Sequence, residues 1–126
     1  DPNDTSSYVG TLSVGETAII TSGSYQRYFV GPDGMKYHHI IDPSTGRPAD
    51  NDLVSVTIVC PDGTLADALS TAMFVLGENA ALKYWRENGG FEMIMINKDN
   101  EIMCTTGLIE VFTLTNRTDY TLKMVE

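Results

Sequence analysis

Two helical segments that follow each other directly, with strand-like runs on both sides, most constrain the fold of this chain. Residues 64–77 contain apolar side chains at helical spacing, namely Leu65, Leu69, Ala72, Met73 and Leu76. We expect Thr64 to be the N-cap of this helix, Asp67 its N3 residue and Gly77 its C-terminal stop. A second helix is expected over residues 79–88, before a pair of glycines. The two segments together predict a helical hairpin.

Short β-branched or alternating runs dominate the rest of the chain. They span residues 17–22, 27–30, 36–41, 53–59, 91–96 and 101–106, and the tail from Ile109 to Val125 continues the pattern. Turn sequences separate the runs, and the one at 97–100 predicts a β-hairpin with a four-residue loop. Strands, then a helical hairpin, then strands indicate an α+β fold, in which the hairpin packs on a mainly antiparallel sheet. With no internal repeat or linker, residues 1–126 are expected to form one domain.

The charge of the chain narrows the classes of partner. Its formal net charge is −9, which argues against a nucleic acid or an anionic membrane surface as a partner. An anionic ligand would need a cation beside it. Cys60 and Cys104 lie in apolar strand-like runs, which favours two buried free thiols over a disulfide or a zinc site.

Asp67 and Thr71 are four positions apart, so a helix places their oxygens on one face. A carboxylate above a hydroxyl is half of a site for a hard cation such as Mg²⁺, which completes its shell with water and phosphate. The spacing equally fits a structural interpretation, in which Asp67 belongs to a capping box with Thr64 and Thr71 bonds back within the helix. From spacing alone, the capping interpretation is favoured.

Both histidines of the chain lie in the run KYHHII, residues 36–41. In a strand, His38 and His39 point to opposite faces, so at most one of them lines a given pocket. Beside Ile40 and Ile41, a histidine is more often a hydrogen-bonded structural residue than a catalyst, so the residues alone favour the structural interpretation.

Two turn-like segments contain polar groups suited to binding. In DPSTG, residues 42–46, Pro43 fits the second position of a turn and Gly46 fits a residue with positive φ. Its backbone N–H groups and Thr45 can grip a phosphate, or they simply turn the chain. The segment TSGSYQRYF, residues 21–29, combines a glycine with rings and a cation, and by itself it indicates a strand with a bulge.

Taken in order, TSGSYQRYF, YHHIIDPSTGRP and SVTIVCPDGTLADALSTAMFVLG resemble the C-terminal half of the ApbE family over about Thr17 to Leu108. Members of that family transfer FMN from FAD to a Thr or Ser of a target flavoprotein and release AMP, with Mg²⁺ as cofactor. The resemblance therefore implies such an Mg-dependent transferase. The alternatives are an FAD pyrophosphatase, which makes FMN and AMP, and a flavin-binding module without catalysis.

The resemblance also implies a role for individual residues. His39 corresponds to the catalytic histidine, and Asp67 and Thr71 correspond to the Mg²⁺ ligands. The positions implied to contact FAD are Ser22, Gly23, Tyr25, Arg27, His39, Ile41, Asp42, Thr45 and Gly46. Ser24 departs from the family pattern, in which an acidic residue is common.

These roles fit elementary chemistry. His39 would act as general base, or as hydrogen-bonding orienter, for the attacking hydroxyl. One negative charge of the FAD diphosphate at about 4 Å from Asp67 would cost about 4 kcal/mol at an effective dielectric constant of about 20. A cation between them converts that repulsion into a bridge, so with the family pattern in view the metal interpretation of Asp67 becomes the favoured one.

Further expectations follow from the resemblance. The family's N-terminal half is absent from this sequence, so we expect the chain alone to bind FAD weakly and to have little activity. Apolar surface left exposed by the missing half would promote a homodimer. Family members are typically lipoproteins, membrane-associated on the extracytoplasmic side of the cytoplasmic membrane through a lipid anchor that this sequence does not contain.

Overall fold

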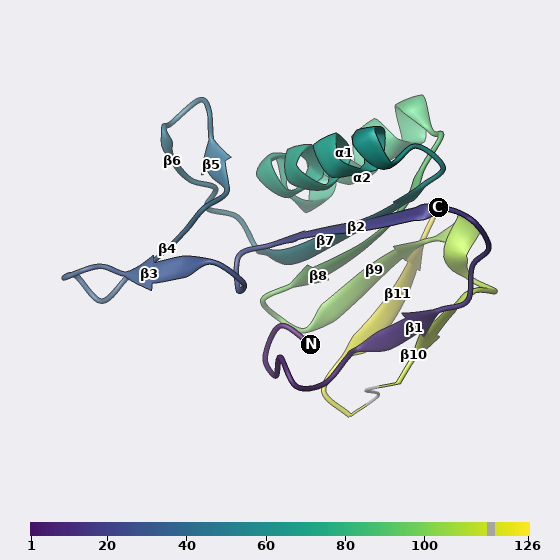
Figure 1. Cartoon of the computed structure of the whole chain (residues 1–126), viewed down its shortest axis with the longest axis horizontal. Coiled ribbons are helices and arrows are strands. Elements are labelled where there is room, and N and C mark those ends of the chain that lie inside the picture. The colour runs from purple at the N-terminus through teal and green to yellow at the C-terminus, as the bar shows by residue number, and fades with distance from the viewer. Residues whose placement is uncertain (116–117) are drawn as a thin grey trace.

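A computed structural model describes residues 1–115 and 118–126, which form a five-stranded mixed sheet with two helices on one face (Figure 1). The strand order is β11-β9-β8-β7-β2. The bounds are β2 Ala18–Gly23, β7 Leu53–Cys60, β8 Glu92–Asn97, β9 Glu101–Thr105 and β11 Thr121–Val125. Neighbouring strands run antiparallel except β11, which pairs with β9 in parallel. The predicted α+β class and mainly antiparallel sheet are confirmed.

The helices are α1, Gly63–Leu76, and α2, Glu78–Asn88, and Gly77 between them ends α1 as predicted. The predicted N-cap is wrong. Asp62, not Thr64, caps α1, because its Oδ1 accepts hydrogen bonds from the N–H groups of Thr64 (2.9 Å) and Leu65 (3.1 Å). Asp67 therefore lies beyond the first turn, and the capping-box interpretation of it is wrong. No helix among the described residues is long and apolar enough to span a membrane.

This cap assignment predicts a stability effect. Asp62→Ala is expected to lower the free energy of unfolding by about 1 kcal/mol, because two N–H groups at the helix start lose their acceptor. Thermal or urea denaturation measures the change. Thr64→Ala is the matched control and is expected to leave stability nearly unchanged. A larger loss of stability in Thr64→Ala than in Asp62→Ala would contradict the assignment.

The apolar face of α1 is also rotated from the predicted stripe. Leu69 and Met73 are buried as expected, but Leu65 and Leu76 are exposed. The face that contacts the sheet comprises Ala66, Leu69, Ser70, Met73 and Phe74. Residues spaced by three or four fall on one side of a helix, and the sheet covers the side that includes the small Ala66 and Ser70.

Apolar residues fill both sides of the sheet. Along β8, Met93 and Met95 face the helices, whereas Ile94 and Ile96 face the opposite layer. That layer contains the strand pair β1 (Gly10–Leu12) and β10 (Phe112–Leu114) with the short 3₁₀ helix η1 (Thr106–Leu108). The hairpin between β8 and β9 is confirmed, but its loop is shorter than predicted because Asn97 still belongs to β8. Strand β7, which lies between β8 and the edge strand β2, is mostly buried.

Two small hairpins project from this body (Figure 1). They pair β3 (Tyr28–Val30) with β4 (Lys36–His38), and β5 (Ile41–Asp42) with β6 (Arg47–Pro48). The predicted single run 36–41 is therefore split. The split occurs because Ile40 is buried in the core beside the helices and its carbonyl accepts from Ala49 N–H at 2.9 Å, which breaks the strand between the hairpins.

The cysteines behave as predicted. Cys60 and Cys104 are both free and buried. Burial, with the charge of Glu92 as a second cause, raises the pKa of the Cys104 thiol to about 11. This thiol therefore stays protonated at neutral pH and is a core side chain, not a nucleophile.

Candidate functional site

Three hydroxyl groups meet where the end of β2 lies against α1. Ser22 Oγ is 2.8 Å from Ser70 Oγ and 3.1 Å from Thr71 Oγ1. Ser70 Oγ in turn donates to the backbone carbonyl of Asp67 at 2.9 Å. The two sequence segments of interest, TSG and DALSTA, are thus joined through side chains. Thr71 does not bond back within the helix; its neighbour Ser70 does.

Asp67 lies one turn before Thr71 on the outer side of α1, and its side chain is exposed. Among the described residues its carboxylate makes no hydrogen bond or ion pair, so it is available to a ligand. No group of three or more His, Cys, Asp or Glu side chains able to hold a metal occurs among residues 1–115 and 118–126. The pair offers two hard oxygens, which fits Mg²⁺ because this ion keeps several waters or phosphate oxygens.

The two histidine rings have different surroundings. The ring of His38 packs edge-on against Phe74, with ring centres 5.7 Å apart, and is half-buried. Its Nδ1 accepts from Ile40 N–H (3.3 Å), and its Nε2 is 3.1 Å from the carbonyl of Ala49. Since a carbonyl only accepts, Nε2 carries the proton. Both nitrogens are occupied, so His38 is structural.

His39 is exposed and is attached to the start of the β3 hairpin. Its backbone N–H donates to the carbonyl of Arg27, and its Nδ1 is 3.3 Å from the same oxygen. The carbonyl requires the proton on Nδ1, which leaves the Nε2 lone pair free toward solvent. A free Nε2 lone pair is the state that a general base needs.

The loop 42–46 forms a tight turn on the β5–β6 hairpin. Asp42 Oδ1 accepts hydrogen bonds from the N–H (2.8 Å) and the hydroxyl (2.7 Å) of Ser44. Both bonds lower the pKa of the Asp42 carboxyl, and the bond from the hydroxyl has the larger effect. Gly46 has φ of 67°, as predicted, and its N–H donates to the Asp42 carbonyl at 2.8 Å. Thr45 Oγ1 accepts from Arg47 N–H at 3.2 Å. These groups shape the turn, and the side chain of Ile41 before it is exposed.

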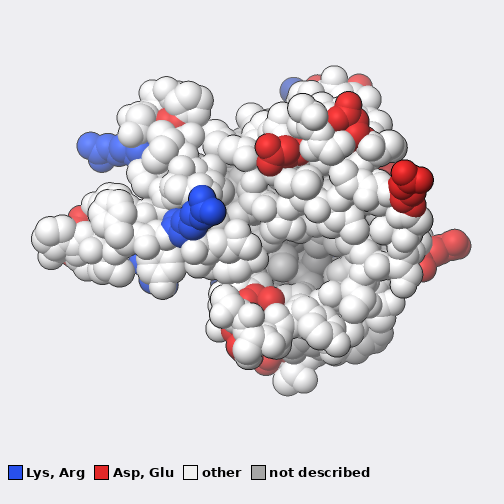
Figure 2. Space-filling view, in the orientation of Figure 1, with Lys and Arg blue, Asp and Glu red and all other residues white. Residues whose placement is uncertain are grey.

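Gly23 is required where β2 ends. A Cβ there would lie 2.5 Å from the ring of Tyr25 and 3.3 Å from the carbonyl of Val54, so only glycine lets the ring lie against the backbone. Tyr25, with Thr21 and Thr57, lines a groove of about 190 Å³ on the sheet face away from the helices. Figure 2 shows the surface hollowed in the body, beside the projecting hairpins.

A family model described as "ApbE family" matches residues 1–95. The chain belongs to the ApbE family. The match begins earlier than Thr17 and ends earlier than Leu108, the approximate bounds of the resemblance described above.

Curated relatives and solved structures agree with this assignment. The chain is 43% identical over 99 residues to the FAD:protein FMN transferase of Treponema pallidum, covering 79% of this chain and 27% of that protein. It is 41% identical over 90 residues to the protein of the same name from Vibrio cholerae, covering 71% of this chain and 26% of that protein. The ApbE protein from Thermotoga maritima has a TM-score of 0.71 at 41% identity, over 85% of this chain and 34% of that one. The flavin transferase ApbE from Vibrio cholerae has a TM-score of 0.55 at 35% identity, and the match covers 79% of this chain and 27% of that one.

This chain thus spans between about a quarter and a third of the length of the relatives it matches. Within that span, the predicted site residues lie in separate places, and Gly23 and Tyr25 lie together beside the groove on the sheet face away from the helices. Ser22 is joined to the Asp67–Thr71 pair by hydrogen bonds, and His39 is joined to Arg27. The turn at 42–46 stands on a separate projecting hairpin (Figure 1).

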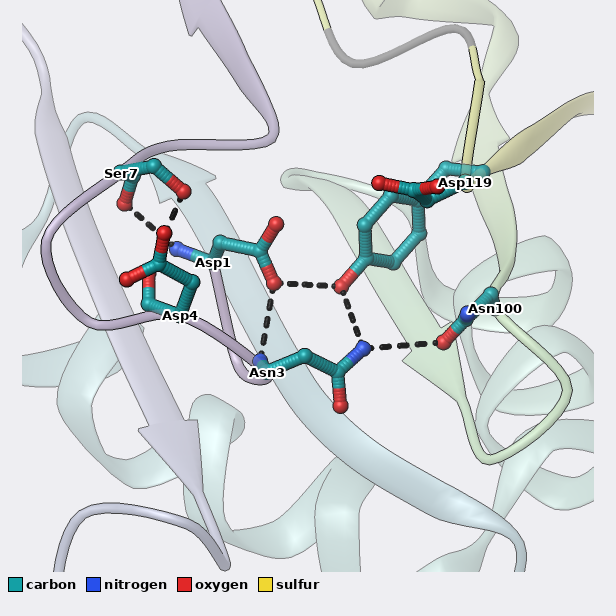
Figure 3. Close-up of a pocket in the computed structure, with 7 residues that line it drawn as sticks. Asp1, Asn3, Asp4, Ser7, Asn100 and Asp119 are labelled. Carbon is teal, nitrogen blue, oxygen red and sulfur yellow. Dashed lines mark hydrogen bonds between the residues drawn. The ribbon is translucent and has the colours of Figure 1, made fainter.

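A second cavity, of about 390 Å³, lies at the N-terminal segment (Figure 3). It is lined by Asp1, Asn3, Asp4, Ser7, Asn100, Asp119 and Tyr120. Asn3 Nδ2 donates to Asn100 Oδ1 (3.2 Å) and to Tyr120 Oη (3.0 Å), and Tyr120 Oη donates to Asp1 Oδ1 (2.6 Å). These bonds fasten the N-terminal segment to the sheet. Because the partners lie about a hundred positions apart, no local sequence signal identifies the cavity.

Proposed function

We propose that this ApbE-family chain forms part of a Mg²⁺-dependent transferase that moves FMN from FAD to a Ser or Thr hydroxyl of an acceptor flavoprotein and releases AMP. The observation that carries this proposal is the exposed Asp67 carboxylate, which has no hydrogen bond or ion pair among the described residues and lies one turn from Thr71, whose hydroxyl contacts the TSG strand. The name FAD:protein FMN transferase, shared by the relatives from Treponema pallidum and Vibrio cholerae, supports the reaction class.

In this proposal Asp67 and Thr71 hold the metal, which when bound neutralises the diphosphate and polarises its phosphoryl oxygens. His39 Nε2 takes the proton from the acceptor hydroxyl. The hydroxyl oxygen forms a bond to the phosphorus of the FMN half, while the bond from that phosphorus to the bridging oxygen breaks. AMP leaves with the bridging oxygen. Arg27, through its carbonyl, fixes the His39 tautomer that can accept the proton.

Hydrolysis of FAD is the second candidate, because the exposed His39 ring is open to water as well as to a hydroxyl. Water in place of the acceptor would give free FMN and AMP. The two reactions are separated in a chimera, in which this chain replaces the matching segment of the Vibrio cholerae relative. After incubation with FAD, Mg²⁺ and an acceptor protein, transfer leaves FMN covalently on the acceptor in mass spectrometry; free FMN alone would contradict transfer.

The chain by itself is expected to release little AMP from FAD, because it spans only about a third or less of the relatives' length. Chromatography of FAD incubated with the isolated chain and MgCl₂ measures this, with the chimera as the positive control. Rapid Mg²⁺-dependent AMP release by the isolated chain would refute the expectation and place all essential groups within these residues.

We further propose that the isolated chain forms a homodimer through its projecting hairpins. Phe29, Val30 and Met35 are 65%, 59% and 62% exposed. Lys and Arg side chains lie on these hairpins, whereas mostly Asp and Glu lie on the rest of the same face (Figure 2). A second copy therefore offers charge complementarity. Sedimentation at rising concentration is expected to show dimers that F29S weakens; a monomer at high concentration contradicts the proposal.

A further inference from the structure

In the cluster of the Ser22, Ser70 and Thr71 hydroxyls between β2 and α1, the donor and the acceptor of each hydrogen bond follow from the number of protons available. Each Ser or Thr hydroxyl has one proton to donate and two lone pairs that accept. Ser70 donates its proton to the carbonyl of Asp67, since a carbonyl only accepts. In the contact between Ser22 and Ser70, Ser22 must therefore be the donor. In the contact between Ser22 and Thr71, the proton of Ser22 is already used, so Thr71 must be the donor.

The result is a one-way relay from Thr71 to Ser22 to Ser70 to the carbonyl of Asp67. It turns the Thr71 proton inward, toward β2, and leaves both Thr71 lone pairs without a partner in the relay. The relay begins at the Thr71 hydroxyl and ends at the backbone carbonyl of Asp67. The Thr71 hydroxyl and the Asp67 carboxylate are the two groups proposed to bind the cation. Ser70 is fully buried. Water is thus excluded from Ser70 and does not replace a lost partner there.

We infer that Ser22 and Ser70 are positioning residues that orient the Thr71 hydroxyl as a lone-pair donor to a divalent cation held with Asp67. This inference rests on the metal site of the proposed function. A hydroxyl binds a cation through its oxygen, so its proton must point elsewhere. The relay meets that requirement before the cation arrives, and the cation would strengthen each bond of the relay by polarising the Thr71 hydroxyl.

The relay makes an unusual prediction for substitutions. In Ser70→Ala, Ser22 loses its acceptor and donates to Thr71 instead. That reversal consumes one Thr71 lone pair and turns the Thr71 proton away from β2, toward the cation. In Ser22→Ala, the Thr71 hydroxyl has no partner on β2 and rotates freely. Removing the buried hydroxyl, which is farther from the cation, should therefore be the more damaging change, and adding Ser22→Ala should partly restore binding.

The test is a titration of this chain with Mn²⁺, read from the paramagnetic broadening of the backbone amide signal of Thr71. We expect Ser70→Ala to weaken Mn²⁺ binding about tenfold and Ser22→Ala about threefold. The double variant is expected to match Ser22→Ala, and the conservative Ser22→Thr to keep the wild-type affinity. Ser24→Ala is the matched control, because the Ser24 hydroxyl donates to the carbonyl of Val54 at 3.4 Å and lies outside the relay.

The outcomes separate the relay from the metal site. If Mn²⁺ does not broaden this signal, or if Asp67→Asn leaves the broadening unchanged, the metal site of the proposed function is wrong. The inference that Ser22 and Ser70 orient a metal ligand then fails with it. If binding depends on Asp67 but Ser70→Ala binds like the wild type, or if the losses of the two serine variants add, the relay is wrong and the metal site stands. Restoration by the second substitution supports the relay, since a merely structural role of either serine predicts additive damage.

Discussion

In the chimera, Asp67→Asn is expected to lower Mg²⁺-dependent FMN transfer by at least about a hundredfold, which corresponds to about 2.7 kcal/mol of lost transition-state stabilisation. Asparagine keeps the size of the side chain and removes its charge. The proposed Mg²⁺ site would thereby lose the carboxylate that offsets the charge of the cation. Covalent FMN fluorescence on the acceptor, followed against Mg²⁺ concentration, measures the effect.

The fold should tolerate this change. Asp67 is exposed, lies beyond the first turn of α1, and makes no hydrogen bond or ion pair among the described residues. Its substitution is therefore expected to change the free energy of unfolding by less than about 0.5 kcal/mol. Asp62→Ala, which does remove a helix cap, is the control for stability. A variant of Asp67 that loses stability yet keeps a normal response to Mg²⁺ would restore the structural interpretation of this residue.

His39→Ala is expected to lower kcat for FMN transfer by about 10²- to 10⁴-fold in the chimera and to leave FAD affinity nearly unchanged. The reason is the free Nε2 lone pair of an exposed ring whose Nδ1 is held by the Arg27 carbonyl. In the proposed mechanism this substitution would remove the acceptor of the hydroxyl proton, while the exposed ring contributes little packing. Single-turnover transfer and an equilibrium FAD titration separate kcat from affinity.

The neighbouring histidine is the matched control. His38 packs against Phe74 and uses both ring nitrogens in hydrogen bonds, so His38→Ala is expected to cost about 1–3 kcal/mol of stability while the folded fraction keeps its activity. If His39→Ala binds FAD and transfers FMN at the wild-type rate, His39 is not the base. If wild-type chimera binds FAD but transfers nothing, the flavin-binding module is the correct alternative.

Local sequence patterns predict which helices and strands this fold contains better than they predict the residues at which each one begins and ends. The positions of both helices and of the β8–β9 hairpin follow from apolar periodicity and turn residues, which act over a few positions. The N-cap was misplaced because PDGT offers both Asp62 and Thr64 as caps, and only the backbone at Asp62 is extended as a cap requires. The split of the run 36–41 follows from burial of Ile40 against the helices, which is a tertiary effect.

The candidate site shows the same limit. The spacing of Asp67 and Thr71 on one helix face is a local property and was predicted. Their connection to Ser22 depends on β2 lying against α1, and Ser22 and Thr71 are 49 positions apart in the sequence. The sequence does not single out Ser70, because the residue type of a serine inside a helix does not by itself indicate a function. Its neighbours in space, not in sequence, give it a role.

The most direct test of the account is a crystal structure of the chimera with FAD and Mn²⁺, in which anomalous scattering locates the metal. The account predicts an anomalous peak within about 2.0–2.3 Å of an Asp67 carboxylate oxygen and of Thr71 Oγ1, on the side facing the FAD diphosphate. A flavin bound with these two oxygens turned away from the diphosphate, or with the metal held elsewhere, would contradict it.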